Sequence, residues 1–255
     1  MLARTRMILP VLLVLPVAAH ADPFRPSREQ QIQLGERAAK DLKAKEKVLP
    51  ESDERVKMLR SIGNRIIAKL SDKDKNWPYT FDVIDKNEVN AFALPGGKTF
   101  FYTGLLSKMK TEDELAAVVG HELTHAYREH FASSYADAQK RELGLAVLLT
   151  ILRADRNMVT VAAISNQLLF DLPFSRRHET EADDRGTDAM VLAGFNPTGA
   201  ANVFRMFQEL KKGGASPEFL STHPDDKNRV KRIEDRIKKM KVTWGPLKPL
   251  PWAKP

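Results

Sequence analysis

The chain of 255 residues contains no cysteine. It therefore has no disulfide bond and no N-terminal cysteine that could carry a lipid, and a closed structural zinc site is disfavoured because such sites usually use cysteine. Long apolar runs are also scarce, and no repeat of solenoid length occurs. With 42% hydrophobic and 29% charged residues, the composition excludes a disordered chain and predicts one globular domain.

Residues 1–21 have the pattern of a cleaved secretory signal. Arg4 and Arg6 precede an apolar run, and Ala19-His20-Ala21 has the A-x-A form of a cleavage site. A membrane anchor is the alternative, but the run of residues 7–19 is shorter than the roughly 20 residues that span a bilayer. A mitochondrial presequence would carry more Arg and Ser. We therefore expect export and a soluble mature chain that begins at Asp22.

The positive charge is spread along the chain. The formal net charge is +8 and falls to +6 when the signal is removed. The most basic stretch, KRIEDRIKKMK at residues 231–241, is interrupted by Glu234 and Asp235, which is typical of a solvated helix face. We expect no nucleic-acid partner, because no nucleic-acid-binding motif is present, whereas an anionic membrane surface or an acidic partner remains open.

Apolar spacing and capping residues predict a mostly helical chain with one small sheet. β-rich runs on either side of Pro95-Gly96-Gly97 predict a hairpin. Thr111 and Glu114 form a capping box that starts a helix through residues 120–127. The fold class expected is α+β, a mostly helical core in which the small sheet packs on that helix. Further helices are expected at 27–47, 52–70, about 175–193, 197–212 and 224–240, within a domain of residues 22–243.

Two segments have no assigned role at this stage. Residues 144–170 are the most apolar part of the mature chain, but charged residues divide them into pieces too short to cross a membrane. They suit a core helix, an interface or a membrane surface. Residues 244–255 are rich in proline and are expected to be extended.

The segment GHELTHAYREH, residues 120–130, carries the chemistry. His121 and His125 are four residues apart, so on a helix both rings point from one face. Glu122 lies beside that face, where it could activate a water molecule on a zinc ion held by the two imidazoles. The five-residue motif H-E-x-x-H also occurs by chance, but its place in the middle of a capped helix strengthens the interpretation.

A third zinc ligand is expected in FSRRHETEADDRG, residues 174–186. Helical spacing places Glu179 and Asp183 on one stripe with the small residues Ala182 and Gly186, which would let two helices approach closely. Glu179 is the better ligand, and Asp183 could orient a ligand histidine from behind. His178 is a rival nitrogen ligand that points away from that stripe.

These motifs resemble those of the minigluzincin zinc metallopeptidases, which include the CAAX prenyl protease and HtpX-like enzymes. H-E-L-T-H is followed about fifty residues later by S-R-x-x-E-x-x-A-D, residues 175–183, and NAFALPGG, residues 90–97, resembles the family's hairpin. STHPDDKNR, residues 221–229, is similar to an element of soluble periplasmic members such as the β-barrel assembly-enhancing protease. The transmembrane helices and tetratricopeptide repeats of some members are missing.

The resemblance implies a zincin-like metallopeptidase core and a role for each matching residue. His121, His125 and Glu179 would bind one zinc ion, Glu122 would be the general base and Asp183 would support a ligand. His223 would be a fourth ligand that can move aside, although from sequence alone a histidine in a Thr-His-Pro loop is more often a surface residue. Arg229 would face the active site and contact substrate or the transition state, whereas its spacing suits an exposed helix residue. Substrate would bind along the strand that begins at Asn90 and Ala91.

The expected function is zinc-dependent hydrolysis of peptide bonds in unfolded or misassembled proteins of the cell envelope, by a periplasmic enzyme. Assembly machinery or a membrane surface could deliver those substrates. A chaperone that keeps a latent peptidase fold is the alternative, but a pure binding protein would not need Glu122. A structural zinc domain is a weaker alternative because the chain lacks cysteine.

Overall fold

A computed structural model describes residues 22–151, 174–224, 228–241 and 243–253, with only the backbone described for 144–151. The predicted signal, residues 1–21, and most of the apolar segment 144–170 lie outside these ranges. Among the described helices, none combines the length and the apolar character needed to cross a membrane.

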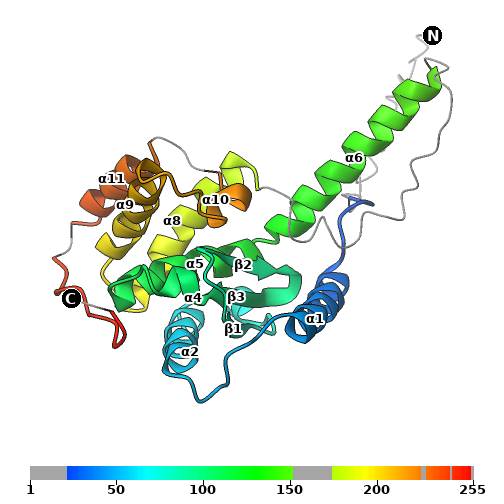
Figure 1. Ribbon diagram of the computed structural model, residues 1–255. Helices are drawn as coiled ribbons and strands as arrows, with labels where there is room; N and C mark the ends of the chain where they lie inside the picture. The colour runs from blue at the N-terminus through cyan, green and yellow to red at the C-terminus, as the bar shows by residue number, and fades with distance from the viewer. Residues whose placement is uncertain (1–21, 152–173, 225–227, 242, 254–255) are drawn as a thin grey trace, which may run out of the picture.

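A three-stranded sheet lies among helices of the molecule (Figure 1). Its order is β1 (Thr80–Ile84), β3 (Lys98–Tyr102), β2 (Ala91–Leu94), with β1 parallel and β2 antiparallel to β3. The predicted hairpin is present, since the short 3₁₀ turn η1 (Pro95–Gly97) joins β2 to β3. Gly96 and Gly97 have φ angles of 76° and 85°, which glycine adopts without steric cost.

Helices cover both faces of the sheet. Phe100 and Tyr102 of β3 point towards α1 (Arg28–Lys45), where they pack with Ala38 and Ala39. Phe101, between them in the strand, points to the opposite face and joins the main core with α2 (Glu54–Ile67) and α5 (Glu112–Tyr127). This alternation follows from the two-residue period of a strand. The sheet is therefore buried on both sides.

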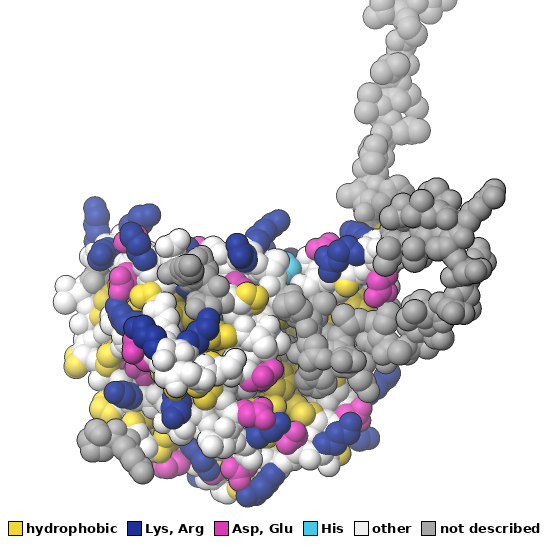
Figure 2. Space-filling view, turned by 45° about the horizontal axis from the view of Figure 1, so that its top comes forward, with side chains coloured by type: hydrophobic (Ala, Val, Ile, Leu, Met, Phe, Trp, Pro, Cys, Tyr) yellow, Lys and Arg dark blue, Asp and Glu magenta, His cyan; other side chains and the backbone are white. Residues whose placement is uncertain are grey.

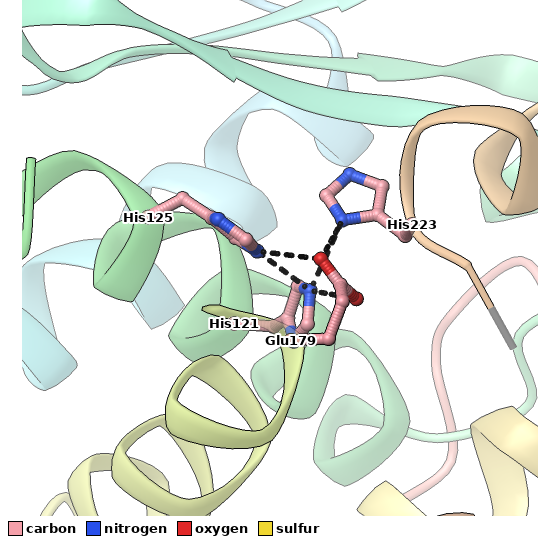
Figure 3. Close-up of side chains that lie close together, drawn as sticks. All are labelled: His121, His125, Glu179 and His223. Carbon is pink, nitrogen blue, oxygen red and sulfur yellow. Dashed lines mark hydrogen bonds and ion pairs between the residues drawn. The ribbon is translucent and has the colours of Figure 1, made fainter. Parts of the chain in front are cut away.

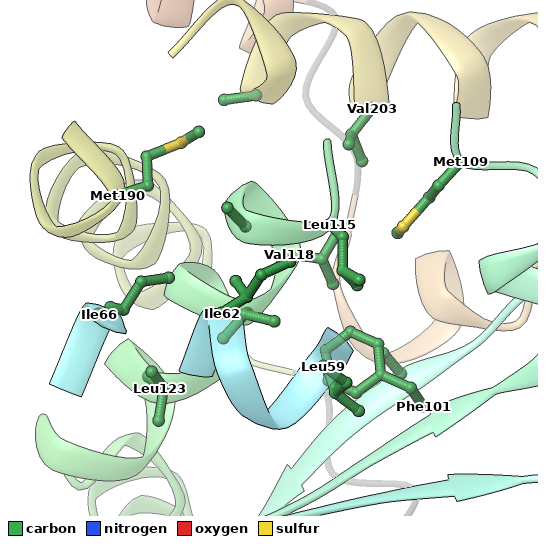
Figure 4. Packing of buried hydrophobic residues seen from close by; sticks show 14 of the residues in the cluster. Leu59, Ile62, Ile66, Phe101, Met109, Leu115, Val118, Leu123, Met190 and Val203 are labelled. Atoms are coloured by element: carbon green, nitrogen blue, oxygen red, sulfur yellow. The ribbon is translucent and has the colours of Figure 1, made fainter. Parts of the chain in front are cut away.

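Helix α5 lies at the centre of the molecule, and all but two of its residues are buried. It packs against α2, β2, α8 (Arg176–Leu192) and α9 (Thr198–Lys212), while α11 (Arg229–Lys239) packs on α8 and α9. The apolar core that surrounds α5 is shown in Figure 4. These observations confirm the α+β class with a small sheet against the motif-bearing helix. Core residues drawn there include Leu59, Ile62, Ile66, Phe101, Met109, Leu115, Val118, Leu123, Met190 and Val203.

In the described ranges, the remaining elements are three short helices and one long one. The short helices are α3 (Asp72–Lys75), α4 (Thr103–Leu106) and α10 (Phe219–Thr222). The long helix, α6 (His130–Ile151), starts next to the end of α5 and runs away from the body of the molecule (Figure 1). The helix expected at 224–240 begins at Arg229, and residues 225–227 are outside the described ranges.

The proline-rich tail is extended, as expected, and lies on the start of α5. Backbone hydrogen bonds join Glu112 to Lys248 and Leu250 to Lys110. The Asp113 carboxylate accepts one of its hydrogen bonds from the Lys248 amide. Leu250 is buried in the core. The described part of the tail therefore holds the N-terminal end of the central helix.

Charged side chains are mixed on the surface rather than segregated. In Figure 2, Lys and Arg are scattered over the visible face with Asp and Glu between them. Ion pairs such as Arg236–Asp188 and Lys231–Asp235 keep opposite charges adjacent. The basic excess therefore does not gather into one patch on this face, as the spread of charge along the sequence indicates.

Candidate metal centre

Four buried side chains from three distant segments converge beside α5 (Figure 3). His121 and His125 project from one face of α5, one turn apart, and Glu179 comes from the first turn of α8. His223 follows α10 directly. Their exposed fractions are only 4%, 2%, 3% and 1% in that order, so the cluster is shielded from solvent.

The atoms that meet are all potential metal ligands. Nε2 of His121 lies 3.0 Å from Nε2 of His125 and 3.3 Å from Nδ1 of His223. Oε1 of Glu179 lies 3.1 Å from the same His223 nitrogen and 3.4 Å from Nε2 of His125. Taken over all four residues, the ligand atoms lie within 4.8 Å of one another.

This donor set fits a zinc ion. Zinc binds histidine nitrogen at about 2.0–2.1 Å in a tetrahedral arrangement, which places neighbouring ligand atoms about 3.3–3.4 Å apart. The observed separations between the ring nitrogens and the carboxylate oxygen are close to that value. A shared cation would satisfy the imidazole nitrogens that face one another in this dry volume, because a neutral ring has a lone pair on the nitrogen that carries no proton.

Two glycines bring the ligand-bearing helices together. A Cβ atom at Gly120 would lie 2.7 Å from the carbonyl oxygen of Gly186, and one at Gly186 would lie 2.8 Å from the carbonyl carbon of Gly120. The backbones of α5 and α8 therefore touch directly beside His121 and about two turns along α8 from Glu179. The sequence analysis predicted a close approach at Gly186, but the matching glycine on α5 is found only in the structure.

Glu122 lies at the edge of the cluster and is fully buried. Burial raises the pKa of its carboxyl group, an effect partly offset by the nearby His223 and His121. Neither carboxylate oxygen makes a well-formed hydrogen bond to a described residue, and Nε2 of His223 is 3.6 Å from Oε1. A buried carboxylate without firm partners is suited to exchanging a proton with a bound water molecule or substrate.

Asp183 and Arg229 contact the ligand side chains from outside the cluster. Oδ1 of Asp183 lies 3.2 Å from Nδ1 of His121, the ring nitrogen that faces away from the cluster. Arg229 donates to both oxygens of Asp183 at 2.8 and 2.6 Å, and its NH2 is 3.0 Å from Oε2 of Glu179. Burial would raise the pKa of Asp183, but the charge of Arg229 outweighs it and holds that pKa below its usual value.

The interpretation of Arg229 as an exposed helix residue is wrong. Its exposed fraction is 0%, and its guanidinium group stacks 3.9 Å from the ring centroid of Phe204. The surface interpretation of His223 is also wrong, because that ring is buried and stacks on Phe219. Burial would lower the pKa of His223, but the carboxylates of Glu179 and Glu122 outweigh it and raise that pKa. In both cases the charged partners lie far away in the sequence, on α8 for Arg229 and on α5 and α8 for His223.

Three further residues from the sequence analysis lie outside the cluster. His178 is absent from it, and its ring stacks on His130 instead. Asn90 immediately precedes β2, and Ala91 pairs with Phe101 and is completely buried. Within the strand, the amide of Ala93 interacts with the Glu122 carboxylate. β2 therefore passes beside the site, although the side chain of Ala91 is turned into the core.

One residue next to the site was missed by the sequence analysis. Nδ1 of the buried His130 lies 3.0 Å from Nδ1 of His125. Burial, with smaller effects from His125 and His178, lowers the pKa of His130 to about 2, so this ring is neutral. Its only sequence signal is a position five residues after His125, which on a continuous helix would point elsewhere.

Comparison with known proteins agrees with this geometry. Residues 53–237 match the model of peptidase family M48. The chain is 37% identical over 182 residues to the mitochondrial metalloendopeptidase OMA1 of Schizosaccharomyces pombe, covering 70% of this chain and 52% of that protein. It is 30% identical over 220 residues to the metalloprotease LoiP of Escherichia coli, covering 80% and 79%. It is 25% identical over 251 residues to a β-barrel assembly-enhancing protease of Yersinia pestis, covering 94% and 50%.

The chain thus spans about half the length of the OMA1 and β-barrel assembly-enhancing proteins and most of LoiP. The family match includes both halves of the candidate centre, from the two histidines of α5 to His223 and Arg229. It confirms the resemblance inferred from H-E-L-T-H and the downstream glutamate motif, and the family's metalloprotease members imply a metal ion at the cluster. The chain belongs to peptidase family M48.

Proposed function

We propose that the protein is a zinc-dependent endopeptidase. The observation that carries this proposal is the convergence of His121, His125 and Glu179 in a dry cluster beside the buried carboxylate of Glu122. The three residues would hold one zinc ion, leaving a position for water or substrate, as catalytic zinc sites require. The names of the related proteins support peptide bonds as the target.

Glu122 acts as general base and then as general acid in this proposal. When bound, a zinc ion polarises the scissile carbonyl and acidifies water. Glu122 takes the proton of the attacking water and passes it to the leaving amine, two steps for which its raised pKa is favourable. Asp183 holds the ring of His121 in orientation through Nδ1, and Arg229 fixes the carboxylates of Asp183 and Glu179.

Substrate binds along β2 in this proposal. β2 is the edge strand of the described sheet, next to β3 only, and its Ala93 amide reaches Glu122. Main-chain pairing that begins near Asn90 and Ala91 would place an extended peptide across the cluster without selecting its side chains. We assign no substrate contact to Arg229, because its guanidinium is buried and already paired with Asp183 and Glu179.

Main-chain pairing of this kind favours unfolded or misassembled proteins as substrates, because they expose their backbone. Together with the export signal expected at residues 1–21, this preference supports substrates among proteins of the periplasm and envelope. The name of the Yersinia pestis relative mentions β-barrel assembly, which supports the same class for this chain. Assembly machinery or a membrane surface would then deliver them.

A chaperone that uses the same edge strand is the second candidate. It is favoured by one observation, the position of His223, whose Nδ1 fills the space between Glu179 and His121 and so closes the cluster. A protein held permanently in that arrangement would bind clients without cleaving them. The buried carboxylate of Glu122 argues for hydrolysis, because a protein that only holds a client does not need a buried carboxylate at this position.

The first test is cleavage of unfolded casein by the chain from Asp22 onward, loaded with zinc. Glu122→Gln removes the general base and should lower the rate by about 10²–10⁴-fold, while zinc content measured by mass spectrometry stays at one ion per chain. Equal cleavage by the two proteins would contradict the assigned role of Glu122. A Glu122→Gln protein that performs the biological role unimpaired would favour the chaperone.

His223 is proposed to keep the enzyme latent until it moves aside. His223→Ala should then raise casein cleavage several-fold, because the position beside Glu122 opens to water and substrate. Ser221→Ala, an exposed change in the same segment, is the matched control and should leave the rate unchanged. A lower rate in His223→Ala with unchanged zinc content would refute the latch and assign His223 to substrate binding instead.

A further inference from the structure

His130 lies at a break between two helices that brings it back to a ligand histidine. On a continuous helix, residues five apart point about 140° away from each other. Here α5 ends at Tyr127, Glu129 adopts a left-handed conformation with φ of 54°, and α6 starts at His130. The turn returns the His130 ring to a T-shaped contact with His125, with ring centroids 4.9 Å apart.

The turn is anchored by other parts of the chain. A residue other than glycine rarely adopts a positive φ unless its surroundings require it. The carboxylate of Glu129 accepts a hydrogen bond from Arg25 at 2.8 Å and one from the buried Gln31 at 3.3 Å. The strained residue is therefore fixed by contacts with the N-terminal region, and the position of His130 does not depend on α6 alone.

The contact between the two rings determines where their protons lie. His125 faces the cluster with Nε2, so a ligand role for that atom requires the proton of the neutral ring to be on Nδ1. That N–H then donates to Nδ1 of His130 at 3.0 Å. His130 must accept through Nδ1 and carry its own proton on Nε2.

The opposite side of His130 suits that arrangement. Nε2 faces Oε2 of Glu181 at 3.5 Å, an electrostatic contact rather than a strong hydrogen bond. Glu181 stays ionised because Oε1 accepts from Arg128 at 2.6 Å and from Arg185 at 2.7 Å. A negative charge there favours the proton on the nearer nitrogen of His130.

We infer that His130 is a positioning residue for the metal centre, which holds the ring of His125 in the orientation and tautomer needed for zinc binding. This inference rests on the proposed zinc site. It gives His125 the support that Asp183 gives His121, but through a neutral imidazole instead of a carboxylate. Through His130, the ligand His125 on α5 is also connected to α8, because Glu181 lies on α8 two residues after the ligand Glu179.

The test is the zinc affinity of variants at position 130, measured by competition with a chelator. His130→Leu removes the acceptor and should raise the dissociation constant of zinc by about 10–100-fold, the range for losing a partner of a ligand histidine. His130→Asn should stay close to wild type, because its amide oxygen can accept from His125. The visible spectrum of bound Co²⁺ should shift in His130→Leu and not in His130→Asn.

His178→Leu is the matched control. Its ring stacks on His130 with centroids 4.4 Å apart, but it is not in contact with the ligand cluster. It should therefore leave zinc affinity unchanged. His130→Ala, which cannot clash, replaces His130→Leu if the latter does not fold.

Either of two results would overturn the inference. The first is wild-type zinc affinity in the Leu or Ala variant at position 130, and the second is an equal loss in His130→Asn, which would show that the hydrogen bond is not what matters. A wild-type protein that fails to bind zinc would instead refute the proposed function. The two failures are thus distinguished by the wild-type measurement alone.

Discussion

Two ligands at the candidate centre, His121 and Glu179, are held by the buried ion pair of Asp183 and Arg229. The Arg229 guanidinium is the extreme case, since it serves Asp183 and Glu179 at once and has no exposed surface. Removing one member of such a buried ion pair leaves the other charge without compensation, which costs far more than the net contribution of the pair.

We therefore expect Arg229→Met to lower the free energy of unfolding by about 3–5 kcal/mol. The Asp183 carboxylate would remain buried with less compensation. Urea unfolding in the presence of a chelator measures this effect without a contribution from metal. Lys231→Ala removes a cation from an exposed ion pair on the same helix and should leave the midpoint of urea unfolding unchanged. A similar loss in both variants would show that net charge, not burial, is responsible.

Two helices meet through glycine backbones, and this contact sets the spacing of the ligands. α5 carries two ligands and α8 carries one, so their separation at Gly120 and Gly186 determines whether the atoms can reach a common ion. The obstacle to a larger residue is backbone, which cannot rotate away as a side chain can.

Gly120→Ala should destabilise the protein by about 1–3 kcal/mol, the usual cost of overpacking a tight contact. It should also weaken zinc binding, because α5 and α8 must separate. Gly213→Ala is the control: it follows α9 with φ of −75°, and its added Cβ would lie 3.5 Å or more from its neighbours. Denaturant midpoints and zinc affinities of the two variants give the comparison. An unaffected Gly120→Ala protein would mean that the helices can move apart freely.

The centre joins parts of the whole molecule that are remote in the chain. α5, α8 and the segment after α10 each contribute a ligand, and α5 is itself held at its other end by the tail through Lys248 and Leu250. A metal ion bound only by the folded state stabilises it by mass action.

Removing the metal should accordingly lower the melting temperature. With free zinc at 1,000 times its dissociation constant, the stabilisation is about 4 kcal/mol, which at about 2–4 °C per kcal/mol corresponds to a shift of about 8–16 °C. Differential scanning calorimetry with and without chelator measures it. Glu122→Gln should keep the full shift, whereas His121→Phe should lose most of it. No shift in the wild type would contradict binding of the metal to the folded cluster.

The chain's own sequence determined the features that depend on local periodicity. The capping box at Thr111 and the four-residue spacing of His121 and His125 define the motif-bearing helix, and the 3.6-residue period selects Glu179 as the facing carboxylate. Hairpin chemistry at Gly96 and Gly97 likewise follows from local backbone preferences.

The tertiary structure decided the features that depend on distant partners. Arg229 and His223 have ordinary surface patterns in the sequence, and only packing against α8 and α5 buries them. His130 reaches His125 through a turn that residues about a hundred positions earlier hold in place. Burial, ion pairing and helix breaks of this kind depend on contacts between distant segments. The local periodicity of the sequence carries no information about such contacts.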